Sequence, residues 1–212
     1  MSPSIPKNLF SAAVLYASYL TYRCQQPPNK NPTAVKQTNA DPFTRSKFTL
    51  LIAYHGHLFL LLGAIHALLR SSLRKPKHPC STLLPMLTIG GATLRLLSFA
   101  QLAKNFTFAV ARPSSLITSG VYAYIQHPGY TGGVCALVGF SGLVLRTGGV
   151  FACWPGLWAS AFVYANYIFV AGFVLWVVTV RVPHEEDMLK GAFGKEWEVY
   201  HARTARFIPW LL

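Results

Sequence analysis

The chain has 212 residues, of which 52% are apolar and 12% are charged, and its formal net charge is +13. Because a soluble domain contains roughly 25% charged residues, this composition excludes an ordinary soluble domain. The basic excess does not indicate a nucleic-acid binder, because the Lys and Arg of residues 1–180 lie mostly in short segments between apolar runs. Nucleic-acid recognition needs a continuous basic face, whereas basic loops beside apolar spans contact anionic lipid headgroups.

Five apolar runs predict an all-α, multi-pass integral membrane protein with about five transmembrane helices. The runs are Asn8–Tyr22, Phe48–Leu69, Thr82–Ala103, Tyr130–Leu145 and Val150–Val180. We expect the first run to be a short membrane helix, because tyrosines replace the small residues that a signal-peptide cleavage site needs. The fifth run is longer than the roughly 20 residues that cross a bilayer. It therefore tilts, kinks near Pro155 or Gly172, or divides into a span and a buried half-helix.

The charges also predict an orientation. Basic residues concentrate in the cytoplasmic loops of membrane proteins. With five spans, a cytoplasmic carboxyl-terminal tail places twelve Lys and Arg on the cytoplasmic side and six on the other side. The composition of the tail differs from the rest, since five of the six acidic residues follow Arg181. Apolar residues at helical spacing, with a break at Gly194, predict two short amphipathic helices at the membrane surface.

The cysteines and histidines predict neither a disulfide framework nor a metal site. The four cysteines lack paired spacing, which is typical of buried reduced thiols. His55 and His57 lie two residues apart, so they point to different faces of a helix. Motifs that bind nucleotide phosphates or carry a hydrolytic serine are absent from the sequence.

Two segments, Leu116–Tyr130 and Arg181–Tyr200, concentrate residues that are unusual near apolar spans. They flank the hairpin formed by the last two runs. A hairpin returns its two ends to one side, so we expect both segments to meet at the cytoplasmic face. Arg181 and Glu185 are four residues apart and share a helical face. They form either a surface ion pair at the helix end or a site in which Arg181 binds an anionic group.

Two other polar residues have open interpretations. His127 precedes Pro128, which disfavours a helical conformation and places the histidine on a loop just before a span. It is either a hydrogen-bonded structural residue or a ligand. Arg95 lies within the third apolar run, where a charge is costly. It is either functional or close enough to one end to extend to the interface.

At the two segments the sequence resembles the isoprenylcysteine carboxyl methyltransferase family. The first family pattern is approximately L-V-T-x-G-x-Y-x-x-x-R-H-P-x-Y-x-G, and residues 116–132 read LITSGVYAYIQHPGYTG. The second is R-x-x-x-E-E, then F-G-x-x-Y-x-x-Y and a closing P. Its counterparts are Arg181, Glu185-Glu186, Phe193-Gly194, Trp197, Tyr200 and Pro209. Two separated motifs in the right order are more specific than either alone.

The resemblance implies a protein-S-isoprenylcysteine carboxyl O-methyltransferase of the endoplasmic reticulum membrane. Such an enzyme uses S-adenosylmethionine, without a metal, to methylate the carboxylate of a prenylated cysteine that ends a protein or peptide. The chain then divides into residues 1–103, with three membrane helices, and a catalytic region, residues 104–212, whose active site faces the cytoplasm. By position, Arg181 is the catalytic residue that binds the substrate. The residues implied to bind the cofactor are Ser114, Ser115, Leu116, Ile117, Tyr122, His127, Pro128, Gly129, Tyr130 and Glu185.

Three departures from the family pattern bear on the substrate more than on the cofactor. Gln126 replaces the usual arginine, Trp197 replaces a tyrosine, and the segment between Tyr130 and Arg181 is longer than usual. The alternatives are methylation of a lipid amine, as in the related phospholipid methyltransferases, and a sterol-type membrane reductase, which needs nicotinamide instead of a methyl donor. A non-catalytic membrane scaffold is a further alternative.

Overall fold

The computed structural model describes residues 7–26, 28, 46–72, 83–106, 112–145 and 157–209, and among them the regular elements are helices. The α-helices are α1 (Lys7–Gln25), α2 (Ser46–Ser72), α3 (Leu83–Leu102), α4 (Pro128–Val144), α5 (Leu157–Trp176), α6 (Val182–Phe193) and α7 (Lys195–Arg203). Two 3-10 turns, η3 (Ala103–Asn105) and η4 (Gly120–Ala123), and one π-helix, η6 (Val177–Arg181), complete this part of the chain. The prediction of an all-α protein is confirmed.

Two helical stretches within the described residues are long and apolar enough to cross a membrane. They are Leu83–Asn105, which contains α3, and Ser160–Phe193, which runs from α5 through η6 into α6. Shorter apolar helical stretches cover Tyr54–Leu68 in α2 and all of α4. The total of five spans and the cytoplasmic orientation of the tail stay predictions.

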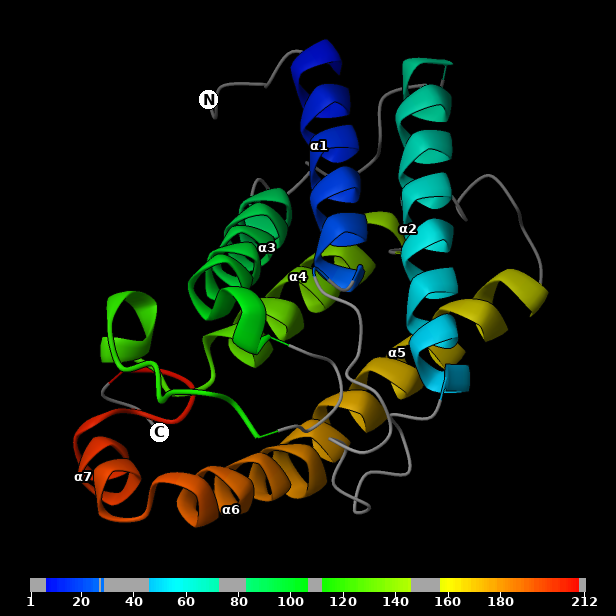
Figure 1. Ribbon diagram of the computed structural model, residues 1–212. Coiled ribbons are helices and arrows are strands. Elements are labelled where there is room, and N and C mark those ends of the chain that lie inside the picture. Colours follow the sequence, from blue (N-terminus) through cyan, green and yellow to red (C-terminus); the bar gives the residue numbers. More distant parts are fainter. Residues whose placement is uncertain are drawn as a thin grey trace.

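The helices form two groups (Figure 1). α1 packs against α2 and α3, and α3 packs against α4. α5, η6 and α6 form one long rod that crosses below the other helices in the view of Figure 1, and α7 lies at its far end. After α7 the chain turns back toward the segment that precedes α4 (Figure 1). This return brings residues from both ends of the last hairpin together.

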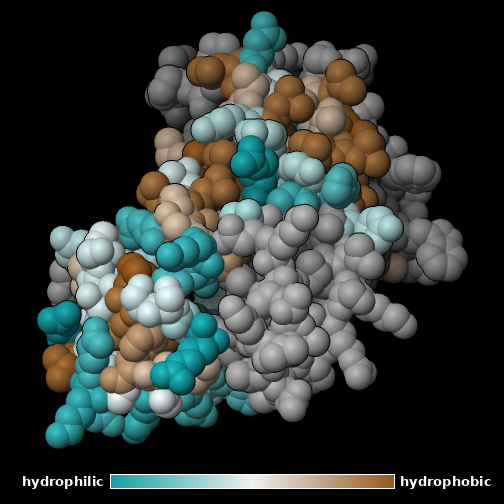
Figure 2. Space-filling view, in the orientation of Figure 1, coloured by the Kyte–Doolittle hydropathy of each residue, from teal (hydrophilic) through white to brown (hydrophobic). Residues whose placement is uncertain are grey.

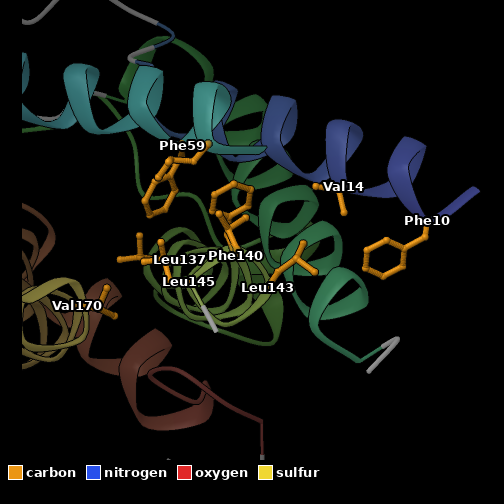
Figure 3. Packing of buried hydrophobic residues seen from close by; sticks show 10 residues of the cluster. Phe10, Val14, Phe59, Leu137, Phe140, Leu143, Leu145 and Val170 are labelled. Atoms are coloured by element: carbon orange, nitrogen blue, oxygen red, sulfur yellow. The ribbon is translucent and has the colours of Figure 1, made fainter. Parts of the chain in front are cut away.

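The apolar core lies where helices of the two groups meet (Figure 3). Val14 of α1, Phe59 of α2, Phe140 of α4 and Val170 of α5 belong to one cluster of buried side chains. The rings of Phe59 and Phe140 stack with their centroids 4.7 Å apart. The rod is therefore attached to the other helices through side chains near the middle of α5.

The backbones of α3 and α4 approach closely at two glycines. A Cβ atom on Gly91 would lie 2.6 Å from the backbone nitrogen of Ala136, and one on Gly132 would lie 2.5 Å from the carbonyl oxygen of Gly91. Small residues permit such close helix contacts in membrane proteins. The contact fixes α4, and with it the residues at the start of α4, against α3.

We expect Gly91→Ala to lower the free energy of unfolding by about 1–3 kcal/mol, because a methyl group pressed against fixed backbone overpacks the contact. A Cβ atom on the neighbouring Gly90 would meet nothing within 4 Å. Gly90→Ala is therefore the matched control, and it should keep or raise the melting temperature, since alanine favours helix over glycine. Thermal unfolding in detergent measures both variants. Equal melting temperatures would contradict the close contact.

The rod corrects one expectation about the fifth run. The helix is continuous through Gly172 and does not end at Val180, but extends to Phe193. Its irregularity is the π-helix η6, and Pro155 lies outside the described residues. The two helices predicted for the tail are present as α6 and α7, although α6 continues the rod instead of starting after a loop, and their position at the membrane surface stays a prediction. They are separated by Gly194, whose φ of 54° is a conformation that glycine adopts without strain.

Candidate functional site

The two segments predicted to form the site meet at the hydroxyl group of Tyr130. This hydroxyl donates a hydrogen bond to Glu185 Oε2 at 2.7 Å and accepts one from Arg181 Nε at 2.9 Å. Tyr130 belongs to the first segment and the two charged residues belong to the second. The prediction that the hairpin brings both segments to one place is therefore confirmed. Arg181 is only 8% exposed, so the interpretation of Arg181 and Glu185 as a surface ion pair is wrong.

Arg181 is the last residue of the π-helix η6. A π-helix closes its hydrogen bonds from residue i to i+5, so each turn is wider than an α-helical turn. In η6 the first and last residues, Val177 and Arg181, are buried, while the three residues between them are exposed. Arg181 and Val177, which are four residues apart, thus lie on the same buried side of the rod, where Arg181 meets Tyr130. Single π-turns of this kind are frequent at functional sites.

His127 lies on a loop immediately before α4, as predicted. Its backbone is non-helical, with φ −120° and ψ 55°, and Pro128 takes the first position of α4. The residue is 4% exposed, and its Nε2 lies 3.0 Å from Glu186 Oε1. The ring centroids of His127 and Tyr130 are 5.9 Å apart. The imidazole is therefore held by an acidic partner while its ring borders the Tyr130 cluster.

Glu186 and Arg206 form a second charged cluster beside the first. Arg206 donates from Nε to Glu186 Oε1 at 2.9 Å and from a terminal nitrogen to Oε2 at 2.6 Å. The hydrogen bonds to Glu186 raise the pKa of the Arg206 guanidinium above its ordinary value. Sequence reasoning gave Glu186 no role and missed Arg206 entirely. The available signal was that Glu186 is one of only six acidic residues in the chain.

The carboxyl-terminal segment is joined to the loop before α4 by backbone and side-chain hydrogen bonds. The backbone N–H of Gln126 donates to the Ala205 carbonyl at 2.8 Å, and the backbone N–H of His127 donates to the Arg206 carbonyl at 3.0 Å. The Gln126 side chain donates to the carbonyls of His201 and Thr204 at the end of α7. Gln126 therefore forms hydrogen bonds through both its backbone and its side chain. Where the family pattern has an arginine, the glutamine side chain binds the end of α7 instead.

Tyr122 and Tyr200 add a third link between the same two regions. The Tyr200 hydroxyl donates to the Tyr122 carbonyl at 2.7 Å, and both residues are buried. Burial raises the pKa of Tyr122, and it raises the pKa of Tyr200 to about 12. Both phenols therefore stay protonated at physiological pH, and this link does not depend on titration.

The residues implied to bind the cofactor are not all equally close to the Tyr130 cluster. Ser114 and Ser115 are exposed and contact Asn105 of η3. The Asn105 side chain accepts hydrogen bonds from the Ser114 amide and hydroxyl and donates one to the Ser115 hydroxyl. Leu116 and Ile117 are half-buried in the segment between those serines and η4. The structure thus groups Tyr122, His127, Pro128, Gly129, Tyr130 and Glu185 at one place, with 114–117 in the adjoining segment.

Arg95 of α3 forms hydrogen bonds to α1 and to the start of α4, where the site begins. Its Nε donates to the Cys24 carbonyl at 3.0 Å, and a terminal nitrogen donates to the Gly129 carbonyl at 2.6 Å. The side chain thus joins α1 and α3 to the first turn of α4, and whether it lies near the membrane interface stays a prediction. A charge is tolerated here because backbone carbonyls replace the missing water.

An open apolar groove of about 580 Å³ lies between α4 and the rod. It is lined by Val134, Val138, Tyr167, Val170, Ala171, Val174, Leu175 and Val178. Val134 follows Tyr130 by one helical turn, and Val178 precedes Arg181 in η6. One end of the groove therefore lies close to the polar cluster.

Hydrophilic and hydrophobic side chains are unevenly distributed over the face of the molecule seen in Figure 2. Figure 2 shows hydrophilic side chains gathered over the α6–α7 end, while hydrophobic side chains are more frequent over the upper helices. Among the described residues there is no group of three or more His, Cys, Asp and Glu side chains that could hold a metal ion. The site thus combines the charged clusters around Tyr130 and Glu186 with an apolar groove.

One family model and several known proteins are similar to this chain. The model of the isoprenylcysteine carboxyl methyltransferase family matches residues 83–191. The chain is 30% identical over 131 residues to proteins of Oryza sativa subsp. indica and subsp. japonica named probable protein-S-isoprenylcysteine O-methyltransferase. It is 28% identical over 125 residues to protein-S-isoprenylcysteine O-methyltransferase B of Arabidopsis thaliana. These alignments cover 59% and 57% of this chain, and the chain spans 59% and 55% of the length of those relatives.

Proposed function

Since the chain belongs to the isoprenylcysteine carboxyl methyltransferase family, we propose that it methylates the terminal carboxylate of a prenylated cysteine in a protein or peptide. The methyl donor in this proposal is S-adenosylmethionine. The observation that carries the proposal is the position of an apolar groove beside the buried Arg181. A prenylated carboxyl end combines the two chemistries, lipid and anion, that this arrangement suits.

Arg181 suits the carboxylate end of such a substrate. A guanidinium presents paired donors that match the two oxygens of a carboxylate. The Nε of Arg181 donates to the Tyr130 hydroxyl, and this hydrogen bond helps to fix the plane of the guanidinium. A terminal carboxylate has an ordinary pKa of about 3.3–3.7, so it is ionised at neutral pH and needs no general base. In this proposal Arg181 orients the carboxylate oxygen that attacks the methyl group.

The groove suits the prenyl chain. Along the rod it extends from Tyr167 to Val178, which is about 16 Å at ~1.5 Å per residue. Twelve main-chain carbons of a three-unit prenyl group, joined by bonds of about 1.5 Å, extend over a similar distance of about 15 Å. The lining side chains are apolar apart from Tyr167. Because the groove is open, the prenyl chain enters sideways from the bilayer while the polar cofactor arrives from water.

The polar residues around Tyr130 suit a cofactor that carries a sulfonium cation. Glu185 is a half-buried carboxylate, and the rings of Tyr122 and Tyr130 present π-faces that attract cations. When bound, S-adenosylmethionine supplies an electrophilic methyl group. Glu185 and the residues of the 116–130 segment would hold it, while Arg181 holds the carboxylate. Placing both in a site shielded from water strengthens the electrostatic interactions that align them.

The proposed setting is a multi-pass protein of the endoplasmic reticulum membrane whose site faces the cytoplasm. Two helical stretches apolar enough to span a membrane support the membrane setting, and the charge distribution of the loops supports the orientation. Both motifs of the site then lie on the side where prenylated protein ends are made available.

Acceptor selectivity tests the proposal. Purified protein in detergent should transfer a labelled methyl group from S-adenosylmethionine to a farnesylcysteine analogue, and farnesylcysteine amide, which lacks the carboxylate, should accept none. Transfer to phosphatidylethanolamine in place of farnesylcysteine would favour lipid amine methylation. Oxidation of a nicotinamide cofactor with a sterol substrate, without methyl transfer, would identify a reductase instead.

A further inference from the structure

The side chain of Gln126 forms three hydrogen bonds to the end of α7. Gln126 lies immediately before His127 and is only 8% exposed. Its Nε2 donates to the carbonyl oxygen of His201 at 3.1 Å and to that of Thr204. Because carbonyl oxygens only accept hydrogen bonds, the amide nitrogen of Gln126 must face them, and Oε1 is left to accept. Oε1 lies 2.8 Å from His201 Nδ1 and accepts a hydrogen bond from that ring nitrogen.

His201 is held in position for this contact by Trp197, which lies one helical turn earlier in α7. The two rings stack with their centroids 4.5 Å apart and their planes inclined by 18°. Trp197 is itself buried, so the stacking restricts the rotation of the imidazole. A side chain that is already restricted loses little further entropy when it forms a hydrogen bond. The Gln126–His201 contact is therefore a fixed link between α7 and the loop before α4.

The link is part of a longer contact between residues 125–131 and residues 201–207. Ile125 and Ala205 form an isolated β-bridge within it. Residues 201–207 lie outside residues 83–191, which the family model matches. Residues 125–131 contain four of the residues implied to bind the cofactor, namely His127, Pro128, Gly129 and Tyr130. The carboxyl-terminal segment thus contacts the central part of the proposed cofactor site.

The proposed acceptor site is built from other elements. Arg181 belongs to η6, and the apolar groove is lined by residues of α4, α5 and η6. Neither Gln126 nor His201 lines that groove. A change at the Gln126–His201 contact should therefore act on the cofactor much more than on the prenylated acceptor.

We propose that Gln126 and His201 are positioning residues that hold residues 125–131 in the conformation that binds the cofactor. This inference rests on the proposed function, because it takes this segment as part of the binding site for S-adenosylmethionine. Without the three hydrogen bonds, the segment would become ordered only when the cofactor binds, and the cost of ordering would weaken binding. Gln126 and His201 thus set the affinity for the cofactor without touching it.

Steady-state kinetics of the detergent-solubilised protein test the inference, with S-adenosylmethionine and a farnesylcysteine analogue varied in turn. Gln126→Met keeps the length of the side chain, but its thioether donates no hydrogen bond and accepts only weakly. We expect it to raise the KM for S-adenosylmethionine about 10- to 30-fold, as expected for the loss of a few neutral hydrogen bonds. The dissociation constant of S-adenosylhomocysteine, measured by calorimetry, should rise by a similar factor.

The KM for the farnesylcysteine analogue should change little in Gln126→Met. This difference between the two substrates separates positioning from general damage to the fold. A smaller fraction of folded protein would lower kcat and leave both KM values unchanged.

Two variants of His201 test whether the hydrogen bond itself matters, and both lose the stacked imidazole. His201→Asn places an amide N–H where the imidazole has its Nδ1–H, so it can still donate to Gln126, whereas His201→Leu cannot. We expect the KM for S-adenosylmethionine to stay near the wild-type value in His201→Asn and to rise about threefold in His201→Leu. Combined with Gln126→Met, the two variants should behave alike, because the acceptor of the hydrogen bond is then absent.

Arg203→Ala is the control, since it changes an exposed residue of α7 and should leave both KM values unchanged. An unchanged KM for S-adenosylmethionine in Gln126→Met, or an equal rise for both substrates, would overturn the inference. Identical behaviour of His201→Asn and His201→Leu in the presence of Gln126 would overturn it as well. If the wild-type protein neither bound S-adenosylhomocysteine nor transferred a methyl group, the proposed function itself would be refuted, and the inference with it.

Discussion

Arg181→Ala is expected to lower the rate of methyl transfer by about 100- to 1,000-fold, the usual loss when a preorganised charged donor is removed from an active site. Arg181 is buried and its Nε bonds to the Tyr130 hydroxyl. Its proposed partner is the carboxylate of the substrate. The affinity for S-adenosylhomocysteine should therefore stay close to the wild-type value. Initial rates with a farnesylcysteine analogue, together with calorimetry, measure the two effects separately.

Two controls make the Arg181 result specific. Thr179→Ala changes an exposed residue of the same π-helix and should keep the rate, so it reports on damage to η6 itself. Arg181→Lys keeps the charge but loses the paired donors, and its rate should lie between those of Arg181→Ala and the wild type. Full activity of Arg181→Ala would refute the role of this residue as the substrate-binding group.

Glu185→Ala is expected to weaken the binding of the cofactor about 10- to 100-fold, because a hydrogen bond between the carboxylate and the amino group or sugar hydroxyls, which S-adenosylhomocysteine shares with the cofactor, contributes about 1.5–3 kcal/mol. Glu185 is half-buried and accepts the Tyr130 hydroxyl at 2.7 Å. Its removal takes away the carboxylate nearest to the cluster and leaves that hydroxyl without its acceptor. The dissociation constant of S-adenosylhomocysteine, measured by calorimetry, gives the size of the effect.

Asp187→Ala is the matched control for Glu185→Ala. Asp187 is an acidic residue of the same helix, two positions further on, and it is exposed. Its loss changes the net charge equally without touching the cluster. If both variants bound the cofactor as the wild type does, the assignment of Glu185 to the cofactor site would be wrong.

The sequence predicted the features that depend on local patterns. Long apolar runs predict helices regardless of their partners, and each described run contains one. Pro128 restricts the backbone of His127, which is why the loop before α4 was predictable. The meeting of the two motif segments followed from the hairpin between them, and the Tyr130–Glu185 hydrogen bond confirms it.

The sequence could not predict features that depend on tertiary contacts. The π-helix η6 contains mainly valine and threonine, which are equally compatible with an α-helix, so the sequence does not mark its wide turn. The pair of Glu186 and Arg206 joins residues 20 positions apart across a turn at Gly194. No periodic pattern marks such a contact, so Arg206 was not singled out.

Isothermal titration calorimetry of the wild-type protein with S-adenosylhomocysteine tests the central idea, that residues 116–130 and 181–200 form one cofactor site. We predict saturable binding at one site per chain, weakened by Glu185→Ala and unchanged by Asp187→Ala. If folded protein released no binding heat over several temperatures and ligand failed to raise its melting temperature, this cluster would not be a methyl-donor site.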